Sequence, residues 1–318
     1  MMDAFVAQHL ERVSRTYAII VPMLPGPLAQ AVGVAYLVMR IVDTIEDAPA
    51  VSAEQRRHLL DRIDPALQGD APALHDLTTP LGDTPAEREL LLDASEVVAR
   101  LRALEPTYRD AIARCAQTMS AGVQRLLVRA AERGGVYPAV RDAAELREYC
   151  YYVAGVVGEM LCTMMAHHLR RPSLLNSREL AVDLGVGLQL VNILKDAASD
   201  SAHGRRYLPG GGAGAAAEER VYRTVLHEAR RCLLRGIDYV LALPTSAAGV
   251  RCFCGLPIAW GGLTLAQAER DPAAAKISRE AVCGAIDRFR QLAGDDEALG
   301  RWLSTLIEPA RDGANVLP

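Results

Sequence analysis

The sequence predicts an all-α fold in which residues 1–318 form a single domain. Apolar residues recur at helical spacings of three and four along almost the whole chain, and the alternation typical of strands is nearly absent. Half of the residues (50%) are apolar, and Ala, Leu, Val and Arg dominate, a composition that favours helices and can fill a large core. The breaks between periodic stretches are short, and none has the composition of a domain linker.

Ten helices are expected, and each ends where helix-breaking residues interrupt the periodicity. The expected helices span residues 3–21, 28–48, 52–66, 84–103, 106–132, 142–170, 174–200, 217–243, 246–268 and 277–306. The main breaks between them fall at PGP (25–27), LTTPLGDTP (77–85), RGG (133–135), RRP (170–172), LPGGGAG (208–214) and LPTS (243–246).

One uncharged stretch, residues 17–39, is long enough to span a bilayer. Pro22, Pro25, Gly26 and Pro27 interrupt it, so we expect two buried helices joined by a turn. The N-terminus lacks a basic region followed by an apolar core, and the C-terminus is polar and short. Neither a signal peptide nor a transmembrane anchor is therefore expected.

The charge and cysteine content also restrict the function. The net charge of −4 is mild and the basic residues are scattered, which excludes the footprint of a nucleic-acid-binding protein. The seven cysteines are odd in number and form no regular framework, so a reduced, cytoplasmic location is expected.

Acidic residues end one of the most apolar stretches of the chain, RIVDTIEDAP (40–49). Four polar positions are spaced by four, three and four residues, which places them on one face of a helix: Tyr36, Arg40, Asp43 and Asp47. Glu46 lies close beside this stripe. About 150 residues later the pattern recurs in LQLVNILKDAASD (188–200), with spacings of three, four and four between Gln189, Asn192, Asp196 and Asp200.

A single stripe of this kind is most simply the solvated side of an amphipathic helix. Here, however, the stripes consist of short Asp and Asn side chains with Gln and Tyr rather than Glu, Lys and Arg, and apolar neighbours flank them. Buried carboxylates need cations or other partners. Two stripes that face each other in a helical bundle would suit Mg²⁺ and the diphosphate of a hydrocarbon substrate.

Seven motifs occur in an order that resembles the squalene and phytoene synthase family, from about residue 12 to residue 290. They are SRTY (14–17), DTIED (43–47), YCYYVAGVVG (149–158), NILKDAASD (192–200), GRRYLP (204–209), FCGLPIAWGGLTL (253–265) and AAAKISREAV (273–282). Each motif alone is weak, but seven in this order are specific. The resemblance implies an isoprenoid synthase fold, with helices around a central cavity, and the condensation of two prenyl diphosphates.

The resemblance also implies roles for individual residues. Mg²⁺ would be held by Asp43, Asp47, Asp196 and Asp200, assisted by Glu46 and Asn192. Diphosphate oxygens would be contacted by Arg15, Arg40, Lys195, Arg205 and Arg206. The pocket near the diphosphates would be lined by Ser14, Tyr36 and Gln189.

The motif YCYYVAGVVG (149–158) contains Tyr152. The resemblance implies that this tyrosine would stabilise the allylic cation or relay a proton. Taken alone, Tyr152 is more simply a core tyrosine. Gly155 and Gly158 would let the substrate approach the backbone, and the alternative is close helix packing.

The motifs look most like a squalene synthase, which joins two farnesyl diphosphates to presqualene diphosphate and then reduces this with NADPH. Lys276 and Arg279 would contact the phosphates of that cofactor. Lys195 stands where Arg is more common, and RRYLP is nearer to the phytoene synthase form, so an alternative product is dehydrosqualene, phytoene or presqualene diphosphate. Another alternative is a non-catalytic prenyl-binding protein. Peripheral contact with a membrane is compatible with lipid substrates.

Overall fold

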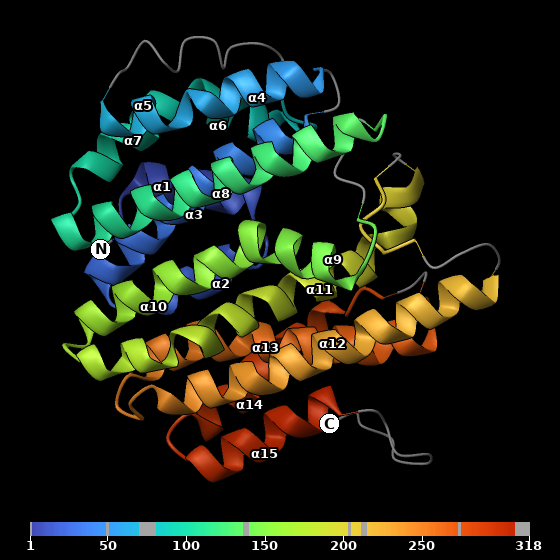
Figure 1. The fold of residues 1–318 in the computed structure, drawn as a ribbon. Coiled ribbons are helices and arrows are strands. Elements are labelled where there is room, and N and C mark those ends of the chain that lie inside the picture. Colours follow the sequence, from blue (N-terminus) through green and yellow to red (C-terminus); the bar gives the residue numbers. More distant parts are fainter. Residues whose placement is uncertain are drawn as a thin grey trace. The chain divides into compact units, whose positions relative to one another are not determined.

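A computed structural model of the chain describes residues 2–48, 51–69, 81–135, 140–202, 205–210, 215–272 and 275–308. Within these ranges every regular element is a helix and no strand is present, so the predicted all-α class is confirmed (Figure 1). The chain divides into two compact units. The first unit comprises Met1–Pro138 and Met160–Pro172, and the second comprises Ala139–Glu159 and Ser173–Pro318. The assignment of one domain to residues 1–318 stays a prediction.

The first unit is built around the long helix α3, whose side chains are mostly buried. Helices α1, α4, α6, α7 and α8 all pack against it. The elements of this unit are α1 (Ala4–Val13), α2 (Tyr17–Ile20), the 3₁₀ turn η1 (Val21–Met23), α3 (Gly26–Asp47), α4 (Ala53–Asp61), α5 (Ile63–Gln68), α6 (Pro85–Leu92), α7 (Ala94–Arg102), α8 (Pro106–Glu132) and the part of α10 (Val156–His168) that follows Glu159.

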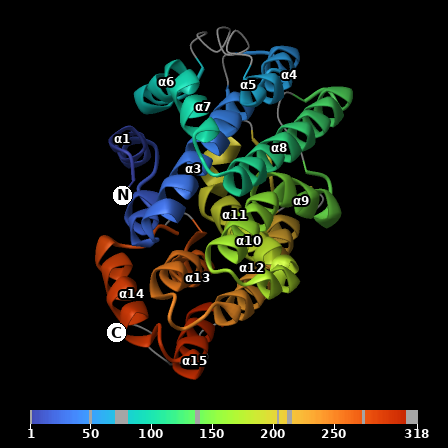
Figure 2. The same ribbon diagram turned by 90° about the vertical axis from the view of Figure 1, so that its left-hand side faces the viewer.

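The second unit is centred on α11, which packs most extensively against α12 and also contacts α9 and α13 (Figure 2). Its elements are α9 (Ala143–Cys150), the π-helical turn η3 (Tyr151–Gly155), the start of α10, the 3₁₀ turn η4 (Pro172–Ser177), α11 (Arg178–Ala202), α12 (Ala215–Ala242), α13 (Ala248–Arg270), α14 (Arg279–Leu292) and α15 (Asp296–Ile307).

Several predicted helices are interrupted, because a residue within a periodic stretch leaves the helical conformation. The helix expected over 3–21 ends at Val13, since Ser14 is extended (φ −147°, ψ 120°) and accepts a hydrogen bond from the Tyr17 amide at 3.0 Å. The helix expected over 84–103 breaks at Asp93 (φ −92°, ψ 12°). The helix expected over 277–306 breaks before Asp295, whose carboxylate accepts from the Ala298 amide and begins α15.

The helix expected over 52–66 is likewise divided at Arg62. Residues 142–170 form a nearly continuous helical run, as predicted. Within this run, η3 forms one π-helical turn between α9 and α10. The break expected over 77–85 falls partly outside the described residues.

Among the residues that the structure describes, three helices are long and apolar enough to cross a membrane by length and composition alone: Gly26–Asp47, Ala143–His168 and Ala248–Arg270. The turn expected within residues 17–39 is present, because η1 ends at Met23 and α3 begins at Gly26. In the structure, 78% of the most apolar window of α3 and of α13 is buried. Only the first of these helices overlaps the stretch, residues 17–39, that the sequence indicated as long enough to span a bilayer. The other two were not predicted.

Candidate active site

The first predicted polar stripe forms on the last three turns of α3. The Arg40 guanidinium donates to the Asp43 carboxylate at 2.8 Å and to the Tyr36 hydroxyl at 3.0 Å. Both contacts join residues three or four apart, so they follow directly from the helical repeat. All three side chains are half-buried. Arg40 therefore links two members of the stripe through hydrogen bonds.

The electrostatic surroundings keep Arg40 charged. Burial by itself would lower the pKa of its guanidinium, but the Asp43 carboxylate and the Tyr36 hydroxyl outweigh burial and raise this pKa above its ordinary value. A carboxylate oxygen of Glu87, from the start of α6, lies 4.0 Å from the same guanidinium. Glu87 was not among the predicted site residues. The pattern Thr-x-x-Glu does indicate the capping box that Thr84 and Glu87 form at the start of α6.

The three carboxylates of DTIED differ in their exposure. The Asp43 side chain is 41% exposed and Asp47 is half-buried, whereas Glu46 retains only 3% of its accessible surface. Glu46 thus lies on the buried flank of the stripe. Its assistance in metal binding stays a prediction.

The predicted SRTY segment lies beside the stripe in the same unit. The rings of Tyr17 and Tyr36 are 5.0 Å apart, and the Tyr36 hydroxyl is 3.5 Å from the Val13 carbonyl oxygen. Ser14 is buried where the chain turns between α1 and α2, while Arg15 is exposed. The residues on both sides of Ser14 thus contact Tyr36. That Ser14 and Tyr36 line a diphosphate pocket stays a prediction.

The second predicted stripe forms on α11. Lys195 donates to the Asn192 side-chain oxygen at 3.0 Å and lies 3.2 Å from the Asp196 carboxylate. Gln189, Lys195, Asp196 and Asp200 are half-buried, and Asn192 is exposed. Each stripe therefore carries its own cation against an aspartate, Arg40 on α3 and Lys195 on α11.

The GRRYLP segment follows α11 and is tied to it by its backbone. The Arg205 amide donates to the Asp200 carbonyl at 2.9 Å, and the ring of Tyr207 stacks on Tyr149 with centroids 4.8 Å apart. Arg205 is half-buried and Arg206 is exposed. This anchoring places both arginines next to the end of the second stripe.

Tyr152 lies in the π-helical turn η3, where its ring contacts that of Tyr151 at 5.4 Å. Its side chain is half-buried. Single π-helical turns occur frequently at functional sites. The cation-stabilising role of Tyr152 stays a prediction.

The glycines near Tyr152 serve helix packing. A methyl group added to Gly158 would lie 2.1 Å from the Ala181 carbonyl oxygen, and one added to Gly185 would lie 2.4 Å from the Ala154 carbonyl oxygen. The segment that carries Tyr152 and helix α11 therefore touch backbone to backbone. The structure supports the packing alternative for Gly158.

An ion cluster around the buried Asp183, nearer the start of α11 than the second stripe, was not predicted from the sequence. Asp183 of α11 is 4% exposed and accepts from Arg147 of α9 at 2.7 Å and from Arg235 of α12. Burial raises the pKa of Asp183, but hydrogen bonds from the two arginines outweigh this and hold it below its ordinary value. The cluster fastens three helices together. The one feature of the sequence that could have indicated this cluster is an aspartate among apolar residues on a predicted helix.

The residues predicted to bind a nicotinamide cofactor lie at the start of α14. Lys276 and Arg279 are both exposed, and Arg279 is the first residue of the helix. Ser278 caps this helix by accepting from the Ala281 amide at 3.1 Å.

The two stripes offer ligands that suit magnesium. Their metal-ligand candidates are all carboxylate or amide oxygens, and a hard cation prefers oxygen. Among the described residues, no three His, Cys, Asp or Glu side chains gather closely enough to hold a metal ion by themselves. Mg²⁺ typically takes one or two carboxylates and completes its shell with water and substrate phosphates, so the donor set fits this ion and not a closed structural site.

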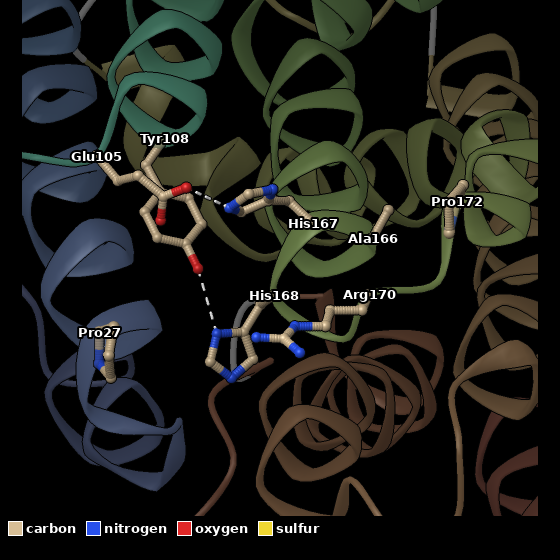
Figure 3. Close-up of a pocket in the computed structure, with 8 residues that line it drawn as sticks. All are labelled: Pro27, Glu105, Tyr108, Ala166, His167, His168, Arg170 and Pro172. Atoms are coloured by element: carbon tan, nitrogen blue, oxygen red, sulfur yellow. Dashed lines mark hydrogen bonds and ion pairs between the residues drawn. The ribbon is translucent and has the colours of Figure 1, made fainter.

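A pocket in the first unit lies between the starts of α3 and α8 and the end of α10 (Figure 3). It is lined by Pro27, Glu105, Tyr108, Ala166, His167, His168, Arg170 and Pro172. His167 pairs with Glu105 at 2.6 Å, and His168 lies 3.2 Å from the Tyr108 hydroxyl. Because the adjacent histidines contact different partners, they do not form a joint metal site. None of the predicted site residues lines this pocket.

Comparison with solved structures defines the class of fold. The ligand complex of TcSQS superimposes with a TM-score of 0.80 at 24% identity, over 95% of this chain and 89% of that chain. A dehydrosqualene synthase in complex with a ligand gives a TM-score of 0.61 at 18% identity, over 91% of this chain and 95% of that chain. The chain therefore has the helical fold of these proteins.

Comparison of sequences defines the family. The family model described as squalene/phytoene synthase matches residues 10–283, so the chain belongs to the squalene/phytoene synthase family. The probable squalene synthase of Neurospora crassa is 30% identical over 203 residues, which cover 64% of this chain and 41% of that protein. The match thus spans less than half of the length of this curated relative.

Proposed function

We propose that this protein catalyses the magnesium-dependent head-to-head condensation of two farnesyl diphosphates to presqualene diphosphate and, with NADPH, to squalene. The observation that carries the proposal is the pair of oxygen-rich stripes, each with its own cation, on long helices of a squalene/phytoene synthase family member. The relatives named squalene synthase support squalene as the product.

In this proposal the aspartates of both stripes, Asp43, Asp47, Asp196 and Asp200, hold Mg²⁺. When bound, the ion neutralises the negative charge that develops on the leaving diphosphate. Arg40 and Lys195 contribute fixed positive charges beside the aspartates, and Arg205 and Arg206 lie where the chain leaves the second stripe. These cations bind and orient diphosphate oxygens.

Tyr152 supplies a polarisable ring and a phenol in the π-helical turn η3, next to Tyr151. Its ring face would favour a nearby carbocation, and its hydroxyl would accept a proton. Lys276 and Arg279, both exposed, would contact the phosphates of NADPH. Location in the cytoplasm and peripheral contact with a membrane stay predictions.

The test is a product assay with purified protein, farnesyl diphosphate and Mg²⁺, with and without NADPH. Squalene that forms only with NADPH supports the full proposal. The same unreduced product in both reactions favours dehydrosqualene or presqualene diphosphate and refutes the reductive step. Absence of any condensation product, with geranylgeranyl diphosphate assayed in parallel, refutes the enzyme and favours a prenyl-binding protein.

A further inference from the structure

The last turn of α3 carries charges that its own helix disfavours. The C-terminus of a helix is the negative end of its dipole and exposes unsatisfied carbonyl groups. Nevertheless, three carboxylates lie within residues 43–47, and no basic residue lies in this last turn. The next residue, Ala48, leaves the helix without a left-handed glycine (φ −58°, ψ 108°). A cation from another element would therefore stabilise this helix end.

Arg56 of α4 supplies a cation at this position. Its guanidinium donates to the backbone carbonyl of Glu46 at 3.0 Å, within a buried contact, and the whole side chain is 0% exposed. A hydrogen bond from a charged donor gains strength where water is excluded. Arg40 reaches the Asp43 side chain one turn earlier, so the two arginines support different parts of the helix end.

Helix α4, which carries Arg56, is anchored by contacts of its own. Helix α4 starts with a capping box in which Ser52 and Gln55 satisfy each other's backbone amides. One turn beyond Arg56, Leu60 is buried, and its carbonyl accepts from the Ser120 hydroxyl of α8 at 3.1 Å. Arg56 therefore acts on α3 from an element that is anchored independently of it.

We propose that Arg56 is a positioning residue, which holds the last turn of α3 so that Asp43 and Asp47 keep the geometry needed to bind Mg²⁺ with substrate diphosphate. This inference rests on the proposed function for the role of the two aspartates. The structural part, that Arg56 stabilises the helix end, holds without any metal. It can therefore be tested separately from catalysis.

The first test is amide hydrogen exchange on the metal-free protein. Arg56→Met removes the cation, Arg56→Lys keeps the charge but loses the planar guanidinium, and Arg57→Met is the matched control at the exposed neighbour on the same helix. Protection of the amides of residues 45–47 should fall about tenfold to a hundredfold in Arg56→Met. It should fall less in Arg56→Lys and stay unchanged in Arg57→Met. If Arg56→Met does not fold, Arg56→Lys decides.

The second readout is the Mg²⁺ concentration that gives half of the maximal rate with farnesyl diphosphate. We expect it to rise at least fivefold in Arg56→Lys and to stay constant in the control, because a displaced carboxylate binds the ion less well. Unchanged protection of residues 45–47 in a folded Arg56 variant overturns the inference, whatever happens to the rate. If the wild-type protein makes no product, the proposed function fails while hydrogen exchange still decides the role of Arg56.

Discussion

Replacement of Gly158 by alanine should destabilise the protein strongly, although a glycine inside a helix is normally improved by alanine. The added methyl group would lie 2.1 Å from the Ala181 carbonyl oxygen, whereas real Cβ atoms essentially never approach closer than 3.0 Å. The two helical segments must therefore separate by about 1 Å. A backbone carbonyl cannot move aside as a side chain can, so the cost should be at the upper end for overpacking, about 3 kcal/mol.

Gly284→Ala is the matched control, because Gly284 lies inside α14 with nothing within 4 Å of the added methyl group. It should stabilise the protein by about 0.5–1 kcal/mol. Urea denaturation followed by circular dichroism compares the two variants. If Gly158→Ala is as stable as the wild type but inactive, the glycine serves substrate approach, and the packing explanation is wrong.

Three further variants test the ion pairs. Asp183→Asn should cost about 2 kcal/mol in urea denaturation, because it leaves two half-exposed arginines without their shared carboxylate. Because the folded-state pKa of Asp183 is lowered, Asp183 contributes fully to stability above its ordinary pKa of 3.8, and this contribution is lost as the pH falls below that value. The free energy of unfolding of the variant should therefore depend less on pH in this acid range. An unchanged pH dependence contradicts this. Burial and the charge of His167 lower the pKa of His168 below 6.5, so the free energy of unfolding should fall as the pH drops below 6.5. His168→Gln should make this dependence on pH less steep. An equal pH dependence in both proteins would exclude His168 as the cause. Arg40→Lys should raise the KM for farnesyl diphosphate about tenfold through the loss of one charged hydrogen bond, and an unchanged KM would remove Arg40 from the binding site.

The two polar stripes could be predicted from the sequence because they depend on the helical repeat alone. Tyr36, Arg40 and Asp43 contact one another through spacings of three and four, which any α-helix provides. The identity of Asn192 and Lys195 as neighbours follows in the same way. The family then follows from motif order, which the family model confirms over residues 10–283.

The remaining features depend on contacts between distant segments, which a periodic pattern does not contain. Nothing near Arg56 in the sequence indicates that it donates to the Glu46 carbonyl on another helix. Asp183 likewise acquires its role from arginines on two other helices. The break at Asp295 was missed because an aspartate cap, unlike proline, leaves the apolar periodicity nearly undisturbed. The Asp93 side chain does not cap α7 but lies 3.1 Å from the His9 ring nitrogen, which is again a contact with a distant segment.

In the proposed function, both acidic stripes serve one magnesium-dependent condensation. The most direct measurement is the rate of diphosphate release from farnesyl diphosphate by the wild type and by the double variant Asp43→Asn with Asp196→Asn. The control is Asp110→Asn with Asp287→Asn, which changes one exposed aspartate in each unit. We predict Mg²⁺-dependent release in the wild type and the control, and loss of at least a thousandfold in the double variant, equivalent to about 4 kcal/mol. Release by the double variant at the wild-type rate would contradict the account.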